Sequence, residues 1–129
     1  MVPASPGKAG RLAPLIETGR GCFYLSPLEG EIIAGHPCAD AVTAAEAVVA
    51  RGARRVIVTD GGERVADAMA GQPTLTVTPP AVRIARITGA GDCFLAAHLV
   101  AEQAGGPREA ALQAATRAAA AHVAGKDLP

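Results

Sequence analysis

In the middle of this chain, the spacing of apolar and polar residues is first that of a helix and then that of a strand. Residues 41–51 are predicted as a helix, because their apolar positions fall on one stripe at 3.6 residues per turn. That stripe consists of Val42, Ala45, Val48 and Val49. Asp40 can cap this helix and Gly52 ends it. Residues 55–59 are a β-branched strand, so the order of helix, strand and glycine turn favours a parallel α/β sheet.

Shorter runs of the same two kinds predict the remaining elements. Apolar or β-branched runs bounded by glycine and proline are typical of strands. The further strands predicted in this way cover residues 22–25, 64–68, 74–78 and 81–87. Helical patterns with capping residues or glycine ends predict helices over residues 6–17, 29–34, 92–104 and 107–123. A chain of 129 residues with these elements is expected to form one domain.

Composition narrows the classes of protein to which this chain can belong. Twelve basic residues balance twelve acidic ones, which argues against a nucleic-acid partner or an anionic membrane surface. The three cysteines are far apart and show no C-x-x-C spacing, so they are expected to be reduced thiols. The sequence has neither a signal-peptide core nor an apolar run of about 18 residues that could span a membrane. We therefore expect a soluble, cytoplasmic protein.

Residues 88–92, Thr-Gly-Ala-Gly-Asp, lie between a predicted strand and a predicted helix. The backbone N–H groups of Gly89, Ala90 and Gly91 can point together at one spot, and such a spot attracts anions. A carboxylate at Asp92 fits this place if it accepts a proton from a hydroxyl nucleophile while the amides stabilise a transferred phosphoryl group. From the spacing alone, a tight turn in which Asp92 only caps the helix is equally consistent.

The run Ile-Thr-Gly-Ala-Gly-Asp-Cys-Phe at residues 87–94 resembles the second signature of the PfkB carbohydrate kinases, D-T-x-G-A-G-D-x-F. The resemblance implies that Asp92 is the base that activates the acceptor hydroxyl. It also implies that the amides of Gly89, Ala90 and Gly91 form the anion hole for the transferred phosphate.

Two more segments match the family in the same order along the chain. Residues 56–63 resemble its V-V-T-L-G-x-x-G strand and loop, and residues 25–31 resemble its K-P-N-x-x-E segment. The first likeness implies a nucleotide-binding loop, and the second places Glu31 at a glutamate that acts indirectly on Mg²⁺. The nucleotide-binding residues that the resemblance implies are Thr59, Gly61, Gly62, Thr88 and Thr116.

The chain departs from the family pattern at several of these motif positions. Leu28 stands where the K-P-N-x-x-E segment has Asn, and Arg64 replaces the second glycine of the nucleotide loop. Arg86 and Ile87 stand where the second signature has Asp and Thr. An alkyl side chain at Leu28 cannot support a network of water and phosphate, which weakens the argument for a metal.

The resemblance implies that residues 1–129 are the carboxy-terminal, nucleotide-binding and catalytic-base portion of a ribokinase-like, Rossmann-like, three-layer α/β/α sandwich. The amino-terminal half, with its substrate-binding strands and lid, has no counterpart in the chain. The implied activity is ATP-dependent phosphorylation, with Mg²⁺, of a hydroxyl on a sugar or nucleoside. The opening residues and the segment around Leu25 look most like the pseudouridine kinase branch.

A hypothesis of a different class stands beside the kinase. The chain could be a truncated, non-catalytic kinase remnant that at most binds nucleotide or a partner chain. The missing half, Leu28 and Arg64 favour this alternative. Either hypothesis allows a homo-oligomer or a complementing amino-terminal half as partner.

Overall fold

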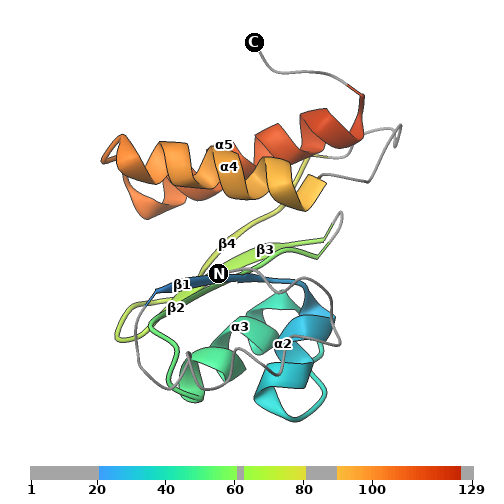
Figure 1. The fold of residues 1–129 in the computed structure, drawn as a ribbon, viewed down its shortest axis with the longest axis vertical. Coiled ribbons are helices and arrows are strands. Elements are labelled where there is room, and N and C mark those ends of the chain that lie inside the picture. Colours follow the sequence, from blue (N-terminus) through green and yellow to red (C-terminus); the bar gives the residue numbers. More distant parts are fainter. Residues whose placement is uncertain (1–20, 61–62, 81–89, 126–129) are drawn as a thin grey trace. The chain divides into compact units, whose positions relative to one another are not determined.

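The structure, a computed structural model, describes residues 21–60, 63–80 and 90–125, which divide between two compact units. The first unit, Met1–Thr76, contains most of a β-sheet and two helices, and the second, Val77–Pro129, contains a pair of longer helices (Figure 1). The helix predicted for residues 6–17 and the strand predicted for residues 81–87 lie outside the described residues.

Within the described residues the sheet has four strands, in the order β1, β2, β3 and β4. They are β1 (Cys22–Leu25), β2 (Arg55–Val58), β3 (Val65–Met69) and β4 (Leu75–Val77). β1 and β2 run parallel, with Cys22 opposite Arg55. Each of these strands lies within one residue of its predicted position, which confirms the strands read from the sequence.

The direction of β3 differs from the expectation of a parallel sheet. β2 and β3 pair antiparallel, with Arg55 opposite Met69. Six residues join Val58 to Val65, whereas a crossover between parallel strands needs a dozen or more. The short connection therefore forces a return in the opposite direction, and the sheet is mixed.

Helix α2 (Pro27–Ala34) begins two residues before the predicted helix, because a capping box fixes its start. The Ser26 hydroxyl accepts the Glu29 N–H at 3.3 Å, and a Glu29 carboxylate oxygen accepts the Ser26 N–H at 2.7 Å. Pro27, at the first helical position, loses no hydrogen bond there. Gly35 ends the helix as predicted, with a left-handed φ of 83°.

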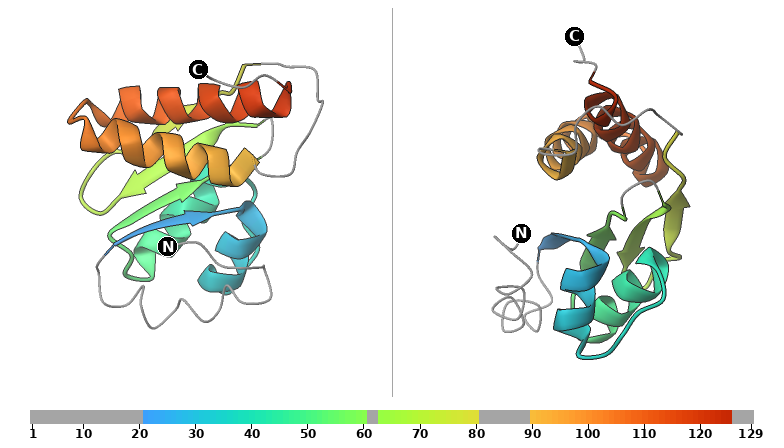
Figure 2. Two further views of the ribbon diagram at one scale, coloured as in Figure 1. Left: turned by 45° about the horizontal axis from the view of Figure 1, so that its top comes forward. Right: turned by 90° about the vertical axis from the view of Figure 1, so that its right-hand side faces the viewer.

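Helix α3 (Ala41–Ala50) forms where the sequence predicts it, with Asp40 as its N-cap. Figure 2 shows α2 and α3 on the same face of the sheet. The core under these helices is built largely from small side chains, and Phe23 is its one aromatic member among the described residues. Its buried residues are Phe23, Leu25, Ile33, Ala41, Ala44, Ala45, Val48, Ala53, Val56, Val58, Ala66 and Ala68.

Small residues also let the two helices of this unit come close to one another. Gly30 on α2 is buried, and a Cβ built on it would lie 3.1 Å from the Cβ of Ala44 on α3. Such a contact is tighter than nearly all real contacts between Cβ atoms. Gly30 therefore allows a helix crossing that a larger residue would push apart.

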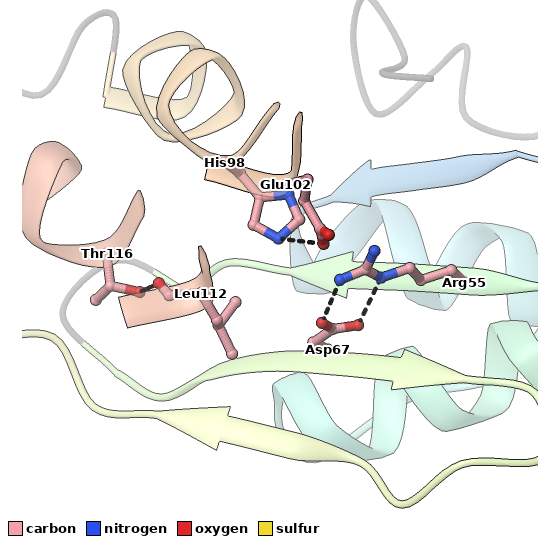
Figure 3. Close-up of polar contacts among 6 residues, drawn as sticks. All are labelled: Arg55, Asp67, His98, Glu102, Leu112 and Thr116. Atoms are coloured by element: carbon pink, nitrogen blue, oxygen red, sulfur yellow. Dashed lines mark hydrogen bonds and ion pairs between the residues drawn. The ribbon is translucent and has the colours of Figure 1, made fainter. Parts of the chain in front are cut away.

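The other face of the sheet carries a buried ion pair. Arg55 and Asp67 alternate with core residues of β2 and β3, so they project away from α2 and α3. The guanidinium donates twice to the carboxylate, Nε to Oδ1 at 3.0 Å and Nη2 to Oδ2 at 2.7 Å (Figure 3). The Asp67 side chain is fully buried, so this two-point geometry offsets part of the cost of removing its charge from water.

The second unit consists of α4 (Ala90–Gln103) and α5 (Arg108–Val123), which pack side by side (Figures 1 and 2). α4 begins two residues before its predicted start, whereas α5 follows its prediction closely. Phe94 and His98 stack on α4 with ring centroids 5.9 Å apart, and His98 Nε2 lies 3.4 Å from Glu102 Oε1. Every helix in the described ranges is too short or too polar to cross a bilayer.

We predict that Gly30→Ala destabilises the chain relative to Gly91→Ala. Both glycines are helical, so both variants gain about 1 kcal/mol of helix propensity. The Gly91 methyl would meet nothing within 4 Å, whereas the Gly30 methyl would lie 3.1 Å from the Ala44 Cβ, so Ala44 would have to shift by a few tenths of an ångström. Overpacking of this kind costs roughly 1–3 kcal/mol, so urea unfolding should give the lower free energy for Gly30→Ala. Equal free energies of unfolding for the two variants would contradict this account of the helix contact.

We predict that Asp67→Leu alone is more destabilising than the double variant Arg55→Met, Asp67→Leu. The single change leaves a largely buried guanidinium without its carboxylate, which costs about 3–5 kcal/mol. The double change removes both charges and restores much of that loss. Urea unfolding of wild type, both single variants and the double variant gives the coupling energy. A double variant that is no more stable than Asp67→Leu would exclude the ion pair as the source of the loss.

Candidate functional site

The first turn of α4 contains three residues of the predicted phosphate site. Ala90, Gly91 and Asp92 are consecutive helical residues, and both Gly91 and Asp92 are exposed. A Cβ at Gly91 would meet nothing within 4 Å, so the space beside this backbone is open. N–H groups in the first turn of a helix lack intrahelical acceptors and favour anions. Gly89 and Thr88 lie outside the described residues.

The position of Asp92 bears on the alternative that it only caps the helix. α4 begins at Ala90, so Asp92 is its third residue and not its N-cap. An exposed carboxylate in the first turn can meet a hydroxyl group that approaches from solvent. The geometry thus suits a proton acceptor beside an anion site.

The next two residues attach this turn to the rest of the unit. The Cys93 thiol is partly buried and donates to the Ala118 carbonyl of α5 at 3.5 Å. Phe94 is buried, with 3% of its surface exposed. The side chains after Asp92 therefore face the packed helices, while Gly91 and Asp92 face outward.

Thr116, which the resemblance assigns to nucleotide binding, lies on α5 in the same unit. Its side chain is buried, and its hydroxyl donates to the Leu112 carbonyl at 2.7 Å (Figure 3). The hydroxyl is thus engaged within its own helix. Its contact with a nucleotide stays a prediction.

The predicted nucleotide loop follows β2 in the first unit. Thr59 is partly buried and extends the parallel pairing, since its N–H donates to the Leu25 carbonyl at 3.0 Å. The Glu63 N–H donates to the Asp60 carbonyl at 2.8 Å. Gly61 and Gly62 lie outside the described residues, so their predicted roles stay predictions.

A pocket of about 250 Å³ lies where α3 begins and β2 ends. Arg64 reaches Asp40 across it at 3.6 Å, but both side chains are about half exposed, so this ion pair is weak. Its lining residues are Ala39, Asp40, Ala41, Val42, Asp60, Glu63 and Arg64. This pocket was not predicted from the sequence. Two sequence features could have indicated it: an arginine at position 64 beside the nucleotide loop, and an acidic helix cap at Asp40 with which it can pair.

Glu31, the residue tied by resemblance to Mg²⁺, has a partner within its own unit. It is partly buried on α2, and its Oε1 accepts the Cys38 N–H at 3.0 Å. Leu28, in place of the family's asparagine, is 53% exposed. Among residues 21–60, 63–80 and 90–125, no three His, Cys, Asp or Glu side chains are arranged to hold a metal ion. The indirect role of Glu31 toward Mg²⁺ stays a prediction.

Comparison with known proteins decides the family. The family model described as "pfkB family carbohydrate kinase" matches residues 23–127. The chain belongs to the PfkB family. This result confirms the family read from the glycine turn at residues 88–92. No curated protein matches the sequence.

Solved structures similar to this PfkB chain include kinases of sugars. A putative sugar kinase from Clostridium perfringens has a TM-score of 0.83 and 22% identity, and the match covers 95% of this chain and 40% of that one. Arabidopsis thaliana ribokinase complexed with ribose and ATP has a TM-score of 0.77 and 26% identity, with coverage of 86% and 36%. A putative ribokinase II from E. coli in complex with ATP and Mg²⁺ has a TM-score of 0.72 and 25% identity, with coverage of 92% and 37%.

These likenesses confirm that the chain has a ribokinase-like α/β fold. The chain spans about two fifths of the length of the kinases it matches. The activity, substrates and partners of a whole kinase are therefore proposals for this PfkB chain.

We predict that the helix cap at Asp40, on the rim of the pocket, makes stability depend on acid pH. The Thr43 N–H, 2.8 Å from Oδ1, lowers the pKa of Asp40 below its ordinary value of 3.8. A lowered pKa in the folded state adds stability above the ordinary value, and this stability is lost as the pH falls through the lowered one.

Asp40→Asn keeps a capping side chain but cannot titrate. Thermal unfolding between pH 6 and pH 2 should therefore show wild type losing stability relative to Asp40→Asn below about pH 4. Asp40→Ala should be less stable than Asp40→Asn at every pH, because it has no cap. Parallel curves for wild type and Asp40→Asn would contradict the role of the ionised cap.

Proposed function

We propose that this chain is the carboxy-terminal, phosphoryl-transfer portion of an ATP-dependent kinase that acts on a hydroxyl of a sugar or nucleoside. The observation that carries the proposal is the outward-facing pair Gly91 and Asp92 at the start of α4, within a motif that resembles the family's signature. Membership of the PfkB family supports it. The similar Arabidopsis ribokinase, complexed with ribose and ATP, supports the substrate class.

Each residue of the first turn has a separate task in this proposal. The amides of Gly89, Ala90 and Gly91 stabilise the charge that grows on the transferred phosphoryl group. Asp92 accepts the proton of the acceptor hydroxyl as that oxygen forms its bond to phosphorus and the bond to the leaving nucleotide diphosphate breaks. ATP supplies the phosphoryl group. The open space beside Gly91 is consistent with close approach of a phosphate.

Nucleotide binding is assigned to the residues that match the family's motifs. In this proposal Thr59, Gly61 and Gly62 form the loop that contacts the nucleotide, and Thr88 and Thr116 contribute to binding. Because Thr116 is buried and its hydroxyl donates to Leu112, its contribution would be indirect. Mg²⁺, the cofactor that the resemblance implies together with ATP, would neutralise charge on the nucleotide phosphates.

The acceptor class is proposed only as far as sugars and nucleosides. Within it, pseudouridine is the candidate that the opening residues of the sequence favour. A panel of ribose, a fructose-type sugar, adenosine and pseudouridine tests the range.

A second candidate is a non-catalytic remnant that binds nucleotide or a partner chain. Leu28 and Arg64, which replace motif residues, favour it. A homo-oligomer or a complementing amino-terminal half would be its partner.

We predict that Asp92→Asn lowers kcat by about 10²- to 10⁴-fold, the usual contribution of a general base, with little change in the KM for ATP. The assay measures phosphate transfer from labelled ATP to the acceptor panel, using the chain alone and joined to the amino-terminal part of a PfkB kinase. Glu109→Gln is the matched control. It neutralises another carboxylate in the first turn of a helix, α5, and should leave turnover unchanged.

Three outcomes separate the two candidates. Turnover that depends on Asp92 supports the kinase, and equal turnover of Asp92→Asn and wild type removes the assigned base. If neither form of the chain transfers phosphate but calorimetry detects ATP binding, the remnant is the correct interpretation. A chain that neither transfers phosphate nor binds ATP would overturn both.

A further inference from the structure

Glu31 lies on α2 and is bonded twice to the segment that follows that helix. Its carbonyl accepts the Gly35 N–H at 2.8 Å, and its carboxylate Oε1 accepts the Cys38 N–H at 3.0 Å. Gly35 has a left-handed φ of 83°, which turns the chain back toward the Glu31 side chain. The backbone and the side chain of Glu31 together fix residues 35–38.

A second effect shows that the Glu31 carboxylate faces this segment. Burial first, and then the negative charge of Glu31 and that of Asp40, raise the pKa of the Cys38 thiol. A carboxylate that acts on the thiol and bonds the amide of the same residue is directed into the loop.

The neighbour of Glu31 on its helix face does not suit the hydration shell of Mg²⁺. This ion keeps several waters and is usually held by one or two carboxylates together with substrate phosphates. One turn before Glu31 on the same helix side, Leu28 presents an alkyl group that is 53% exposed and cannot hydrogen-bond those waters.

We propose that Glu31 is a positioning residue that anchors the loop between α2 and α3, and that it does not take part in metal handling in this chain. The inference rests on the proposed function, because a role of Glu31 in metal handling would matter only if the chain transfers a phosphoryl group from ATP. Its physical basis, the bond to Cys38, is independent of turnover.

The anchored loop leads directly to the pocket at the start of α3. Asp40 is two residues beyond Cys38, caps α3 and lines that pocket with Arg64. Loss of the anchor should therefore loosen the pocket rim as well as the loop. Glu31 would act on the nucleotide side of the first unit through this loop and not through a cation.

The test uses NMR spectroscopy on the full ¹⁵N-labelled chain, with Mn²⁺ as a paramagnetic stand-in for Mg²⁺, alone and with ATP. Glu31→Gln keeps an oxygen acceptor and removes the charge, whereas Glu31→Ala removes both. Glu29→Gln is the matched control, because it neutralises another carboxylate of α2, one that bonds Ser26.

We expect hydrogen exchange at the Cys38 amide to be close to wild type in Glu31→Gln and Glu29→Gln. Glu31→Ala should exchange about tenfold faster, as expected for one lost hydrogen bond. Mn²⁺ should broaden the signals of Glu31 and Cys38 no more than those of Glu29, with or without ATP.

The opposite pattern would overturn the proposal. It consists of Mn²⁺ broadening centred on Glu31 that disappears in Glu31→Gln, or of unchanged exchange at Cys38 in Glu31→Ala. Neither result depends on phosphate transfer, so failure of this inference is separate from failure of Asp92 as base.

Discussion

The first unit depends on the close approach that small side chains permit between α2, α3 and the sheet. A Cβ at Gly30 would lie only 3.1 Å from the Cβ of Ala44, and Ala44 and Ala45 are fully buried. A core with a single described aromatic residue gains little contact area per side chain, so its elements must lie near one another to exclude water. The same close packing holds α3, whose first turn is capped by Asp40, against α2 and the sheet.

The sequence predicted those parts of the fold that local patterns determine. The α3 helix was found from its stripe, cap and terminal glycine, and β2 from its β-branched run. Strand direction leaves no local pattern in the sequence, so the expected parallel sheet was wrong for β3. The only feature that indicates its antiparallel direction is the short connection after Val58. The start of α2 was also missed, although the Ser26 and Glu29 spacing is a known cap signature.

In the candidate site, too, local sequence patterns predicted some features and not others. The glycine turn placed Ala90, Gly91 and Asp92 at a helix start because that placement is local. The bonds of Glu31 and Thr116 could not be predicted from the sequence. Each depends on which acceptor or donor the surrounding backbone presents once the loop or helix has formed. A motif identifies the residue type at a position, but the partner of its side chain is decided by the folded neighbourhood.

The two-point contact between Arg55 and Asp67 also protects against misalignment of neighbouring strands. If β3 slipped by one residue, an alanine would face the guanidinium, and the Asp67 carboxylate would turn into the apolar layer beneath the helices. The alanines on either side of Asp67 are too uniform to oppose such a slip by shape alone. In a sheet built from small residues, one buried charge pair thus supplies the alignment that bulky side chains provide elsewhere.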